Sequence, residues 1–533
     1  MGIPETIAQA YASHDGGDSA QALRLLDAVL QAPAGNMEPR ADLLFARGNV
    51  RRESGDTAGA AEDFSAALAA QPAHAKAHNN LGVILQEQGR LEEAQAAFEQ
   101  ALAHGAQFAD AAFNLGTVLR ARQRLEEALS CFQSATLWRP GFTGAWLHLG
   151  QVFAESGRLE ESVRALRQAI ATDPAFAGAY NDLGLVLAEM NLVREGMQAQ
   201  EQAVAHAPDS DEFKTNLGLL LMELGELGRA WELYEHRWRA DGRLRPAYRY
   251  DPSIEWHGGA LTGKRLRVWW EQGLGDTLCF SRFLPQVAGR FGPAAISLEV
   301  QPGCKRLLAN SFPGVEVLEQ GEAGSGFDVH VPLVSLPQRC GVSRETLPVD
   351  LPYLVPTAEA RARWQARLAQ VPGPRVGLVW ASGLWPTGAG PQRRSRSVDP
   401  EVFGQLIEIP GVSFISLQKG AGAAHAGRWA DQPGFFDWTG ELDDFDETAA
   451  LMAGLDLVIT VDTSVTHLSG ALGKPTWVPL RFEGGNLWLA NQERSLWYPP
   501  VRVYRQSRQA VWSDVIVRIG RDLRERIAQG AGA

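Results

Sequence analysis

The sequence is poor in cysteine, has no excess of basic residues and contains no long apolar run. The 533 residues include four cysteines, Cys131, Cys279, Cys304 and Cys340, and none of them stands at a CxxC or other metal-ligand spacing. This usage predicts reduced thiols in a cytoplasmic protein. Fifty basic residues against 62 acidic ones give a net charge of −12. That balance argues against a general nucleic-acid binder and against a binder of anionic membranes.

Targeting and membrane-spanning patterns are also lacking. No apolar run approaches about 18 residues, so we expect no transmembrane segment. The first residues, MGIPETIAQAY, lack the basic and then apolar regions of a signal peptide. The remaining composition, 45% hydrophobic and 21% charged, is ordinary for folded protein, and the length predicts about three or four domains.

An internal repeat of 34 residues occupies residues 1–240. The repeat is marked by glycines at one fixed interval: Gly48, Gly82, Gly116, Gly150, Gly184 and Gly218. A small residue follows each glycine after 12 positions, and a large residue such as Phe98 or Phe132 follows several of them after 16. This is the pattern of a tetratricopeptide superhelix, an α-solenoid. We expect the small residues to let two helices approach, the large ones to fill the gap between repeats, and residues 5–34 to form an atypical cap.

A polar residue stands two positions before the glycine in five repeats, as Asn80, Asn114, His148, Asp182 and Asn216. An amide side chain offers both a donor and an acceptor, as an extended peptide backbone requires. Here the sequence resembles the repeat superhelix of the O-linked N-acetylglucosamine transferases, where an asparagine ladder grips a peptide. The resemblance implies a protein acceptor in the groove. Polar residues that only face solvent are the alternative, and His148 and Asp182 depart from the ladder.

The second half alternates short apolar runs with amphipathic stretches, after a junction at 241–260 that is rich in charge, proline and glycine. Strands are expected at 265–270, 295–300, 314–318, 327–331, 375–380, 412–417, 456–461 and 475–479. Helices are expected at 357–370, 400–408 and 446–454. Such alternation predicts parallel sheets in α/β units. We expect two Rossmann-like lobes, residues 261–356 and 357–511, with a helix in 512–533 packing back across both.

One segment of the second lobe indicates a function. In residues 456–475, DLVITVDTSVTHLSGALGKP, a strand ends at Asp462, and Thr463 and Ser464 open a helix that carries His467. This resembles the D-T-G-x-x-H donor-site pattern of the lipopolysaccharide heptosyltransferases of glycosyltransferase family 9. Ser464 stands where that pattern has glycine.

Three further segments resemble the same family: GLGDTL at 273–278, RSRSVDP at 394–400 and ISLQKG at 415–420. Repeats followed by such a module are similar to the bacterial tetratricopeptide-containing glycosyltransferases. That resemblance implies a nucleotide-sugar glycosyltransferase of the GT-B architecture. It also implies a protein acceptor, with flagellin and a nonulosonic acid such as pseudaminic acid as one example.

The loop at 272–276 is expected to bind the acceptor. The resemblance implies that Asp276 is the base that deprotonates the acceptor hydroxyl. Gln272, Gly273 and Gly275 belong to the same loop, and the two glycines leave room for a substrate. Asp276 also suits a helix N-cap, and the two roles can coexist.

The donor phosphate is expected at the helix N-terminus near Thr463 and Ser464, where backbone N–H groups favour anions. His467 can donate a charge-assisted hydrogen bond if it is protonated, although a lone histidine on a helix is more often structural. Asp462 is expected to orient the turn. Lys419 and Arg396 are the expected cations for the phosphate, and the alternative is a solvated surface charge. Further candidates are Arg393 and Arg394 in the same basic run, and Trp380, Ser382, Gln418 and Trp438 for the base or sugar pocket.

No metal ion and no cofactor beyond the nucleotide-sugar co-substrate are expected. The DFD segment at 444–446 imitates a metal-binding DxD, but we expect Asp446 to cap the following helix. The favoured function is transfer of a sugar to Ser or Thr of a captured protein. Two alternatives remain open: a scaffold or chaperone whose transferase module is degenerate, and an enzyme like the lipopolysaccharide heptosyltransferases.

Overall fold

The computed structural model describes residues 2–31, 37–240, 249–383, 396–485 and 487–530. Part of the junction, residues 241–248, and both Arg393 and Arg394 lie outside the described residues. The chain divides into two compact units, Met1–Val186 and Leu187–Ala533. Each unit is described by itself.

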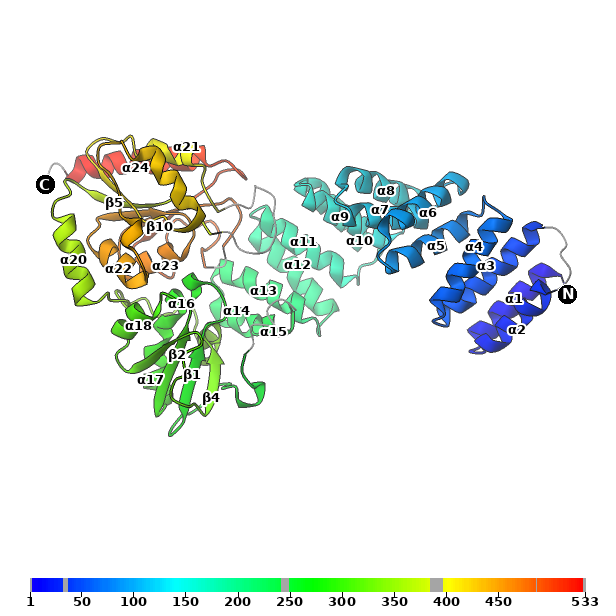
Figure 1. The fold of residues 1–533 in the computed structure, drawn as a ribbon, viewed down its shortest axis with the longest axis horizontal. Helices are drawn as coiled ribbons and strands as arrows, with labels where there is room; N and C mark the ends of the chain where they lie inside the picture. Colours follow the sequence, from blue (N-terminus) through cyan, green and yellow to red (C-terminus); the bar gives the residue numbers. More distant parts are fainter. Residues whose placement is uncertain (1, 32–36, 241–248, 384–395, 486, 531–533) are drawn as a thin grey trace. The chain divides into compact units, whose positions relative to one another are not determined.

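The first unit is a series of paired helices (Figure 1, blue to cyan). They are α1 (Ile3–Asp15), α2 (Ser19–Leu30), α3 (Met37–Glu53), α4 (Thr57–Ala70), α5 (Ala75–Glu87), α6 (Leu91–His104), α7 (Ala109–Ala121), α8 (Leu125–Trp138), α9 (Thr143–Glu155), α10 (Leu159–Thr172) and the start of α11 (Ala177–Glu189). The two helices expected for each repeat are confirmed, and the expected cap is the pair α1 and α2.

Four repeat glycines, Gly48, Gly82, Gly116 and Gly150, each receive a large side chain from the second helix of their own pair. A Cβ added at Gly82 would lie 2.7 Å from Cε1 of Phe98, and one at Gly116 would lie 2.8 Å from Cε1 of Phe132. Any side chain at the glycine would therefore overlap the ring. The large residue packs within its own repeat, besides joining the apolar cluster that neighbouring repeats share.

The second unit begins inside the repeats. Its first complete helices are α12 (Val193–His206), α13 (Asp211–Leu224), α14 (Leu227–Tyr234) and α15 (Arg237–Ala240). Trp231 of α14 packs edge-on against Phe280 and Trp497, with ring centroids 5.7 Å and 6.1 Å away. The last repeat thus shares its apolar core with the α/β region. The compact unit therefore begins at Leu187, before the boundary that we expected near residue 240.

Two parallel sheets follow the repeats. The first has the order β3-β2-β1-β4 and the second the order β10-β9-β8-β5-β6-β7. The first lobe contains β1 (Arg265–Trp269), α16 (Leu274–Phe280), α17 (Leu284–Phe291), β2 (Ala295–Val300), α18 (Lys305–Ser311), β3 (Val315–Glu319), β4 (Val329–Pro332) and α19 (Leu336–Cys340). The second contains α20 (Ala358–Leu368), β5 (Arg375–Val379), α21 (Pro400–Phe403), β6 (Ser413–Ser416), β7 (Phe435–Asp437), α22 (Phe445–Ala453), β8 (Leu457–Thr460), α23 (Ser464–Ala471), β9 (Thr476–Leu480), β10 (Val501–Arg505) and α24 (Ser513–Gly530).

The expected strands are confirmed within a few residues at each end, and two edge strands were missed. β7 spans three residues and β10 reads VRVYR. A strand at a sheet edge is short or carries charged side chains, so it lacks the apolar run of a central strand. The C-terminal helix α24 packs on β10, β9 and α21. These elements belong to the second lobe, so the helix does not pack as we expected, across both lobes.

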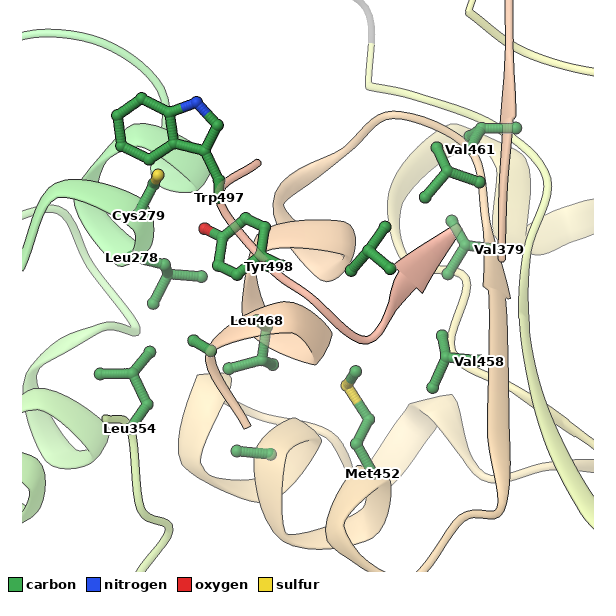
Figure 2. Close-up of a cluster of buried hydrophobic side chains, with 14 of the residues drawn as sticks. Leu278, Cys279, Leu354, Val379, Met452, Val458, Val461, Leu468, Trp497 and Tyr498 are labelled. Atoms are coloured by element: carbon green, nitrogen blue, oxygen red, sulfur yellow. The ribbon is translucent and has the colours of Figure 1, made fainter. Parts of the chain in front are cut away.

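An apolar core joins the two lobes where α16 of the first meets α23 of the second. Figure 2 shows Leu278 and Cys279 on the first-lobe side, and Leu468 and Tyr498 on the second-lobe side. These side chains are buried. Both helices begin directly after a strand, α16 after β1 and α23 after β8. In α/β sheets, ligands bind at such carboxyl ends of strands.

Candidate active site

Asp276 lies in the first turn of α16, three residues after the helix N-cap. Its Oδ2 accepts a hydrogen bond of 3.0 Å from the backbone N–H of Gly273, which is that N-cap. Asp276 therefore reaches back to the cap instead of being the cap itself. Burial raises the pKa of Asp276, the Gly273 N–H lowers it, the charge of Asp462 raises it and that of Arg396 lowers it, and the net value is about 6. A carboxylate that titrates near neutral pH suits a general base.

Asp462 is buried just after the carboxyl end of β8, close enough to Asp276 for the two charges to interact. Its Oδ1 accepts a hydrogen bond of 2.9 Å from the indole Nε1 of Trp488, and its Oδ2 lies 3.4 Å from Nη1 of Arg396. Asp462 thus orients Trp488 and holds Arg396 close to Asp276. Trp488 was missed by the sequence reasoning, because its only signal is the aromatic-rich stretch around it, which resembles core.

His467 on α23 is buried between aromatic rings. Its Nδ1 lies 3.1 Å from the hydroxyl of Tyr498, and its ring stacks on Trp488 with centroids 5.8 Å apart. Burial lowers the pKa of His467 to about 4, and the positive charges of Arg282 and Arg396 act in the same direction. The imidazole is therefore neutral at pH 7. This corrects the expectation of a protonated, charge-assisted donor.

Gly275 lies where α16 of the first lobe packs against α23 of the second. A Cβ added there would lie 2.8 Å from Cδ2 of His467 and 3.4 Å from Cα of Ser464. The space beside Gly275, which we expected a substrate to use, is therefore taken by α23. Gly275 is needed so that the first turns of α16 and α23 can meet.

Thr463 is the N-cap of α23, and its backbone N–H donates to the hydroxyl of Thr466 at 3.3 Å. The first N–H groups of an α-helix have no partner within the helix, so they suit an anion. The start of α23 remains the predicted place for the donor phosphate.

Two of the proposed pocket residues are structural. Gln418 accepts hydrogen bonds from the backbone N–H groups of Trp380 and Ala381 at 3.0 Å and 2.8 Å, and its amide donates to two carbonyls. Gln418 therefore ties the end of β6 to the end of β5. Trp380 is fully buried against Trp429, with ring centroids 4.9 Å apart. The expectation that these two side chains line a ligand pocket is wrong.

The other second-lobe candidates lie nearer to the surface. Ser382 donates its backbone N–H to the hydroxyl of Ser397 at 3.1 Å, and Ser397 is the residue after Arg396. Lys419 is exposed, and its Nζ donates to the carbonyl of Thr439 at 2.8 Å. Trp438 stacks beneath the guanidinium of Arg367 at 4.3 Å. Lys419 and Arg396 remain the predicted phosphate cations.

The DFD carboxylates have structural partners. Asp444, and not Asp446 as expected, is the N-cap of α22, and it accepts from the backbone N–H of Glu447 at 2.9 Å. Asp446 accepts from the N–H and hydroxyl of Thr357 at 2.9 Å and 2.6 Å. Arg306 of the first lobe pairs with both aspartates, which links the lobes at a second point.

In the first unit, the expected amide rungs bond to one another. Asn80 donates to Asn49 at 2.8 Å, Asn79 donates to Asn80 at 3.2 Å, and Asn114 donates to Asn79 at 3.0 Å. Asn49 and Asn79 were not predicted. The sequence pattern that could have found them is an asparagine one position after Gly48 and three positions before Gly82. The rungs are therefore held in a row, while each amide retains further hydrogen-bonding capacity.

The two departures from the ladder belong to a second polar network. Arg120 donates to His148 at 3.1 Å and to Gln151 at 2.6 Å, and Gln151 donates to Asp182 at 2.7 Å. Burial, with Arg120 nearby, lowers the pKa of His148 to about 4, and burial raises the pKa of Asp182. His148 and Asp182 are therefore linked to each other through Arg120 and Gln151. The last rung, Asn216, is half-buried on α13 of the second unit.

The acceptor loop is tied to the last repeat. Gln272 donates its amide to the hydroxyl of Tyr234 on α14 at 3.0 Å. Glu271, one residue earlier, forms a buried ion pair with Arg237 of α15 at 2.8 Å. Tyr234 and Arg237 were missed as site residues, because nothing in the sequence places the last repeat beside this loop.

The chain thus combines helical repeats of the tetratricopeptide type with two parallel-sheet α/β lobes, and the N-termini of α16 and α23 meet between the lobes. Residues 45–94 and 73–136 match models of the tetratricopeptide repeat, and residues 150–191 match a model of the TPR repeat. Residues 411–477 match the model of glycosyltransferase family 9 (heptosyltransferase). That match includes Asp462, Thr463, Ser464 and His467, so it confirms the resemblance stated from the sequence.

A curated relative covers part of the chain. Protein FlbA of Caulobacter vibrioides (strain ATCC 19089 / CIP 103742 / CB 15) is 30% identical over 325 residues, a match that includes 57% of this chain and 53% of that protein. The chain spans about half the length of this relative.

Some solved structures are similar to part of this chain. YrrB, a TPR protein with an unusual peptide-binding site, is 24% identical with a TM-score of 0.30, over 32% of this chain and 87% of that one. The type IV pilus biogenesis factor PilW is 20% identical with a TM-score of 0.36, over 40% of this chain and 98% of that one. Among the described residues, no helix has the length and apolar character needed to cross a membrane.

Proposed function

We propose that this protein is a nucleotide-sugar-dependent protein O-glycosyltransferase of the GT-B type. The observation that carries the proposal is the position of Asp276. Its carboxylate, with a pKa raised to about 6, lies beside Asp462 and Arg396, on the helix that packs against α23. The start of α23 lies within the region that matches glycosyltransferase family 9.

The proposed reaction is a single glycosyl transfer. The Asp276 carboxylate takes the proton from a Ser or Thr hydroxyl of the acceptor, and the resulting oxygen forms a bond to the anomeric carbon of the sugar. The bond between that carbon and the phosphate oxygen breaks, and the nucleotide leaves with the electron pair. The first N–H groups of α23, with Arg396 and Lys419, would stabilise the leaving phosphate. Neutral His467 would act by packing and by hydrogen bonding.

The proposed reaction needs no metal ion. The two aspartates that imitate a DxD motif already have partners, Asp444 as a helix cap and Asp446 as the acceptor of two bonds from Thr357. Cationic side chains of the protein would neutralise the leaving group in place of a metal ion.

The proposed acceptor is a protein segment held by the repeats. The row from Asn49 to Asn114 supports this, since side-chain amides can pair with a peptide backbone. Flagellin is the acceptor to test first. The buried thiols of Cys279 and Cys304 are free, which suits the cytoplasm that we propose as the place of reaction.

The test is intact mass spectrometry of flagellin co-expressed with the wild type or with Asp276→Asn, in cells that make nonulosonic acids. We expect a sugar-sized mass gain with the wild type and none with the variant. Circular dichroism of the purified variant shows whether it is folded. No gain with either protein would contradict flagellin as the acceptor.

A non-catalytic scaffold with a degenerate transferase module is the second candidate, because Ser464 replaces the glycine of the family pattern. Ser464 lies at the packed start of α23, where its Cα would be 3.4 Å from a Cβ added at Gly275. Isothermal titration with nucleotide diphosphates and monophosphates separates the candidates, since a scaffold would bind none of them. An enzyme like the heptosyltransferases would instead turn over isolated lipid acceptor without a protein partner.

A further inference from the structure

We propose that the last repeat, α13 to α15, is part of the transferase site, because it positions the two loops that flank that site. Tyr234 and Arg237 position residues 271–276, and Glu223 positions residues 481–490, apart from Asn486, which lies outside the described residues. This inference rests on the proposed function for its kinetic consequences, but its structural consequences can be measured without turnover.

The acceptor loop is held from the repeat side by two buried contacts. The Arg237 guanidinium donates to both carboxylate oxygens of Glu271, at 3.0 Å and 2.8 Å, and both side chains are about 1% exposed. Glu271 also accepts from the backbone N–H of Val334 at 3.0 Å. A buried charge pair of this geometry fixes the residues that carry it, since moving either partner leaves a charge without compensation.

Tyr234 extends this support toward Asp276. Its hydroxyl accepts from the amide of Gln272 at 3.0 Å, and the carbonyl of Gln272 accepts from Gln301 at 2.9 Å. The next residue, Gly273, donates its N–H to Asp276. One repeat side chain therefore acts on the proposed base through two successive loop residues.

The opposite loop rests on Glu223, near the end of α13. The Glu223 carboxylate lies directly against Gly484, so that a side chain there would collide with it, and the Glu223 carbonyl accepts from the N–H of Ala490 at 2.8 Å. Between these points lies Trp488, whose indole bonds to Asp462 and stacks on His467. Glu223 is 8% exposed, and its Oε2 has no hydrogen-bond partner among the described residues. Packing therefore explains its position better than a hydrogen bond does.

Helix α13 carries both this support and one predicted peptide rung. Asn216, the last predicted peptide rung, and Glu223 are seven residues apart, which places them on one face of the helix, about 10 Å apart along its axis. An acceptor segment that bonds to Asn216 would therefore contact the same helix that positions the 481–490 loop.

The test is hydrogen–deuterium exchange of the full chain without substrate, on Tyr234→Phe and Glu223→Ala. Exchange of the protected amides of Asp276 and Thr277 should rise roughly tenfold in Tyr234→Phe and stay unchanged in Glu223→Ala. The amide of Trp488, which bonds to the carbonyl of Gly485 beside the Glu223 contact, should show the opposite pattern. Glu223→Gln, which keeps the shape of the side chain, should restore protection. Arg229→Gln, which removes an exposed ion pair to Glu201 on the same repeat, is the matched control and should change neither loop.

Steady-state kinetics give the second readout. Tyr234→Phe should lower kcat several-fold at an unchanged donor KM, and Glu223→Ala should raise the donor KM. Equal exchange increases in both loops, or no increase in either, would overturn the positioning proposal. A wild type without turnover would contradict the proposed function alone, and the exchange pattern would still decide the positioning proposal.

Discussion

The repeats and the transferase module use the same close contact at very different sequence separations. In the repeats, Gly82 accepts the ring of Phe98, which comes 16 residues later, and this spacing recurs. In the module, Gly275 accepts the ring of His467 from the other lobe. Both contacts bring two helices together at a position without a side chain. The comparison shows that a helix pair can be predicted from the sequence when its contacts are local and periodic. It cannot be predicted in this way when the two helices come from different lobes.

Buried histidines extend the comparison. His148 in the repeats and His467 in the module both stack on an aromatic ring, with centroids 5.5 Å from Phe132 and 5.8 Å from Trp488. Burial lowers the pKa of each to about 4. In both regions, a histidine that the sequence suggested as a binding residue is neutral at pH 7 and packed against an aromatic ring.

The largest expected effect separates the chemistry of the module from binding by the repeats. Asp276→Asn removes the proposed base and should lower kcat by about 10²–10⁴-fold. Affinity for the acceptor protein should not change, because the amide row is unaltered. Single-turnover kinetics and titration of the acceptor check both statements. A loss of acceptor affinity equal to the loss in kcat would contradict the assignment of Asp276 to chemistry.

The second prediction compares the two glycine contacts directly. Gly275→Ala and Gly82→Ala each force a Cβ into a ring, and each should destabilise its unit by up to about 3 kcal/mol. Thermal unfolding measures the loss. Gly289→Ala is the control, because a Cβ at this position of α17 meets nothing within 4 Å. Only Gly275→Ala should also abolish turnover, since it separates α16 from α23. Equal losses of activity in Gly275→Ala and Gly82→Ala would contradict the claim that only the Gly275 contact supports the transferase site.

The third prediction concerns Glu223, whose pKa burial raises to about 7, with Glu483 nearby acting in the same direction. A folded pKa above the unfolded value means that the protonated form is favoured by folding, so stability is lost as pH rises through about 7. Glu223→Gln removes this loss. It should be about 3 kcal/mol more stable than the wild type at about pH 8, and equal to it below about pH 4.5. Denaturant unfolding at the two pH values checks the sign, and a pH-independent difference would contradict it.

The smallest expected effect concerns the amide row. Asn114→Ala removes one donor and one acceptor from the groove and should weaken acceptor binding by about 0.5–1.5 kcal/mol at unchanged kcat. Ser130→Ala is the control, because Ser130 is exposed on α8 and bonds only within its own helix. An unchanged affinity in Asn114→Ala would favour the alternative that these polar residues only face solvent.

Much of the fold could be predicted from the sequence, for reasons that lie in particular residues. The repeat helices follow from glycines at a fixed interval, and the central strands from apolar runs such as LRVWW before Asp276. The edge strands β7 and β10 contain no continuous apolar run of this kind. The burial of Trp380, and the use of Gln418 as a tie between two strands, depend on contacts between distant segments that no local pattern records.

Asp276, Asp462 and His467 were proposed as site residues because short motifs carry them, and their roles stay predictions. Trp488, Tyr234 and Arg237 were not proposed, because they contribute through long-range contacts that no local pattern records. The neutral state of His467 could not be read from the motif either, since its pKa depends on how deeply the two lobes bury it.

The measurement that tests the central claim most directly is the pH dependence of kcat/KM for the wild type. If Asp276 is the base, activity requires its ionised form, so kcat/KM should rise with pH and reach half of its plateau near pH 6, the raised pKa of the free enzyme. Asp276→Asn should lack this rise. A half-maximum near pH 4, or a profile that is flat from about pH 5 to 8, would contradict Asp276 as the catalytic base.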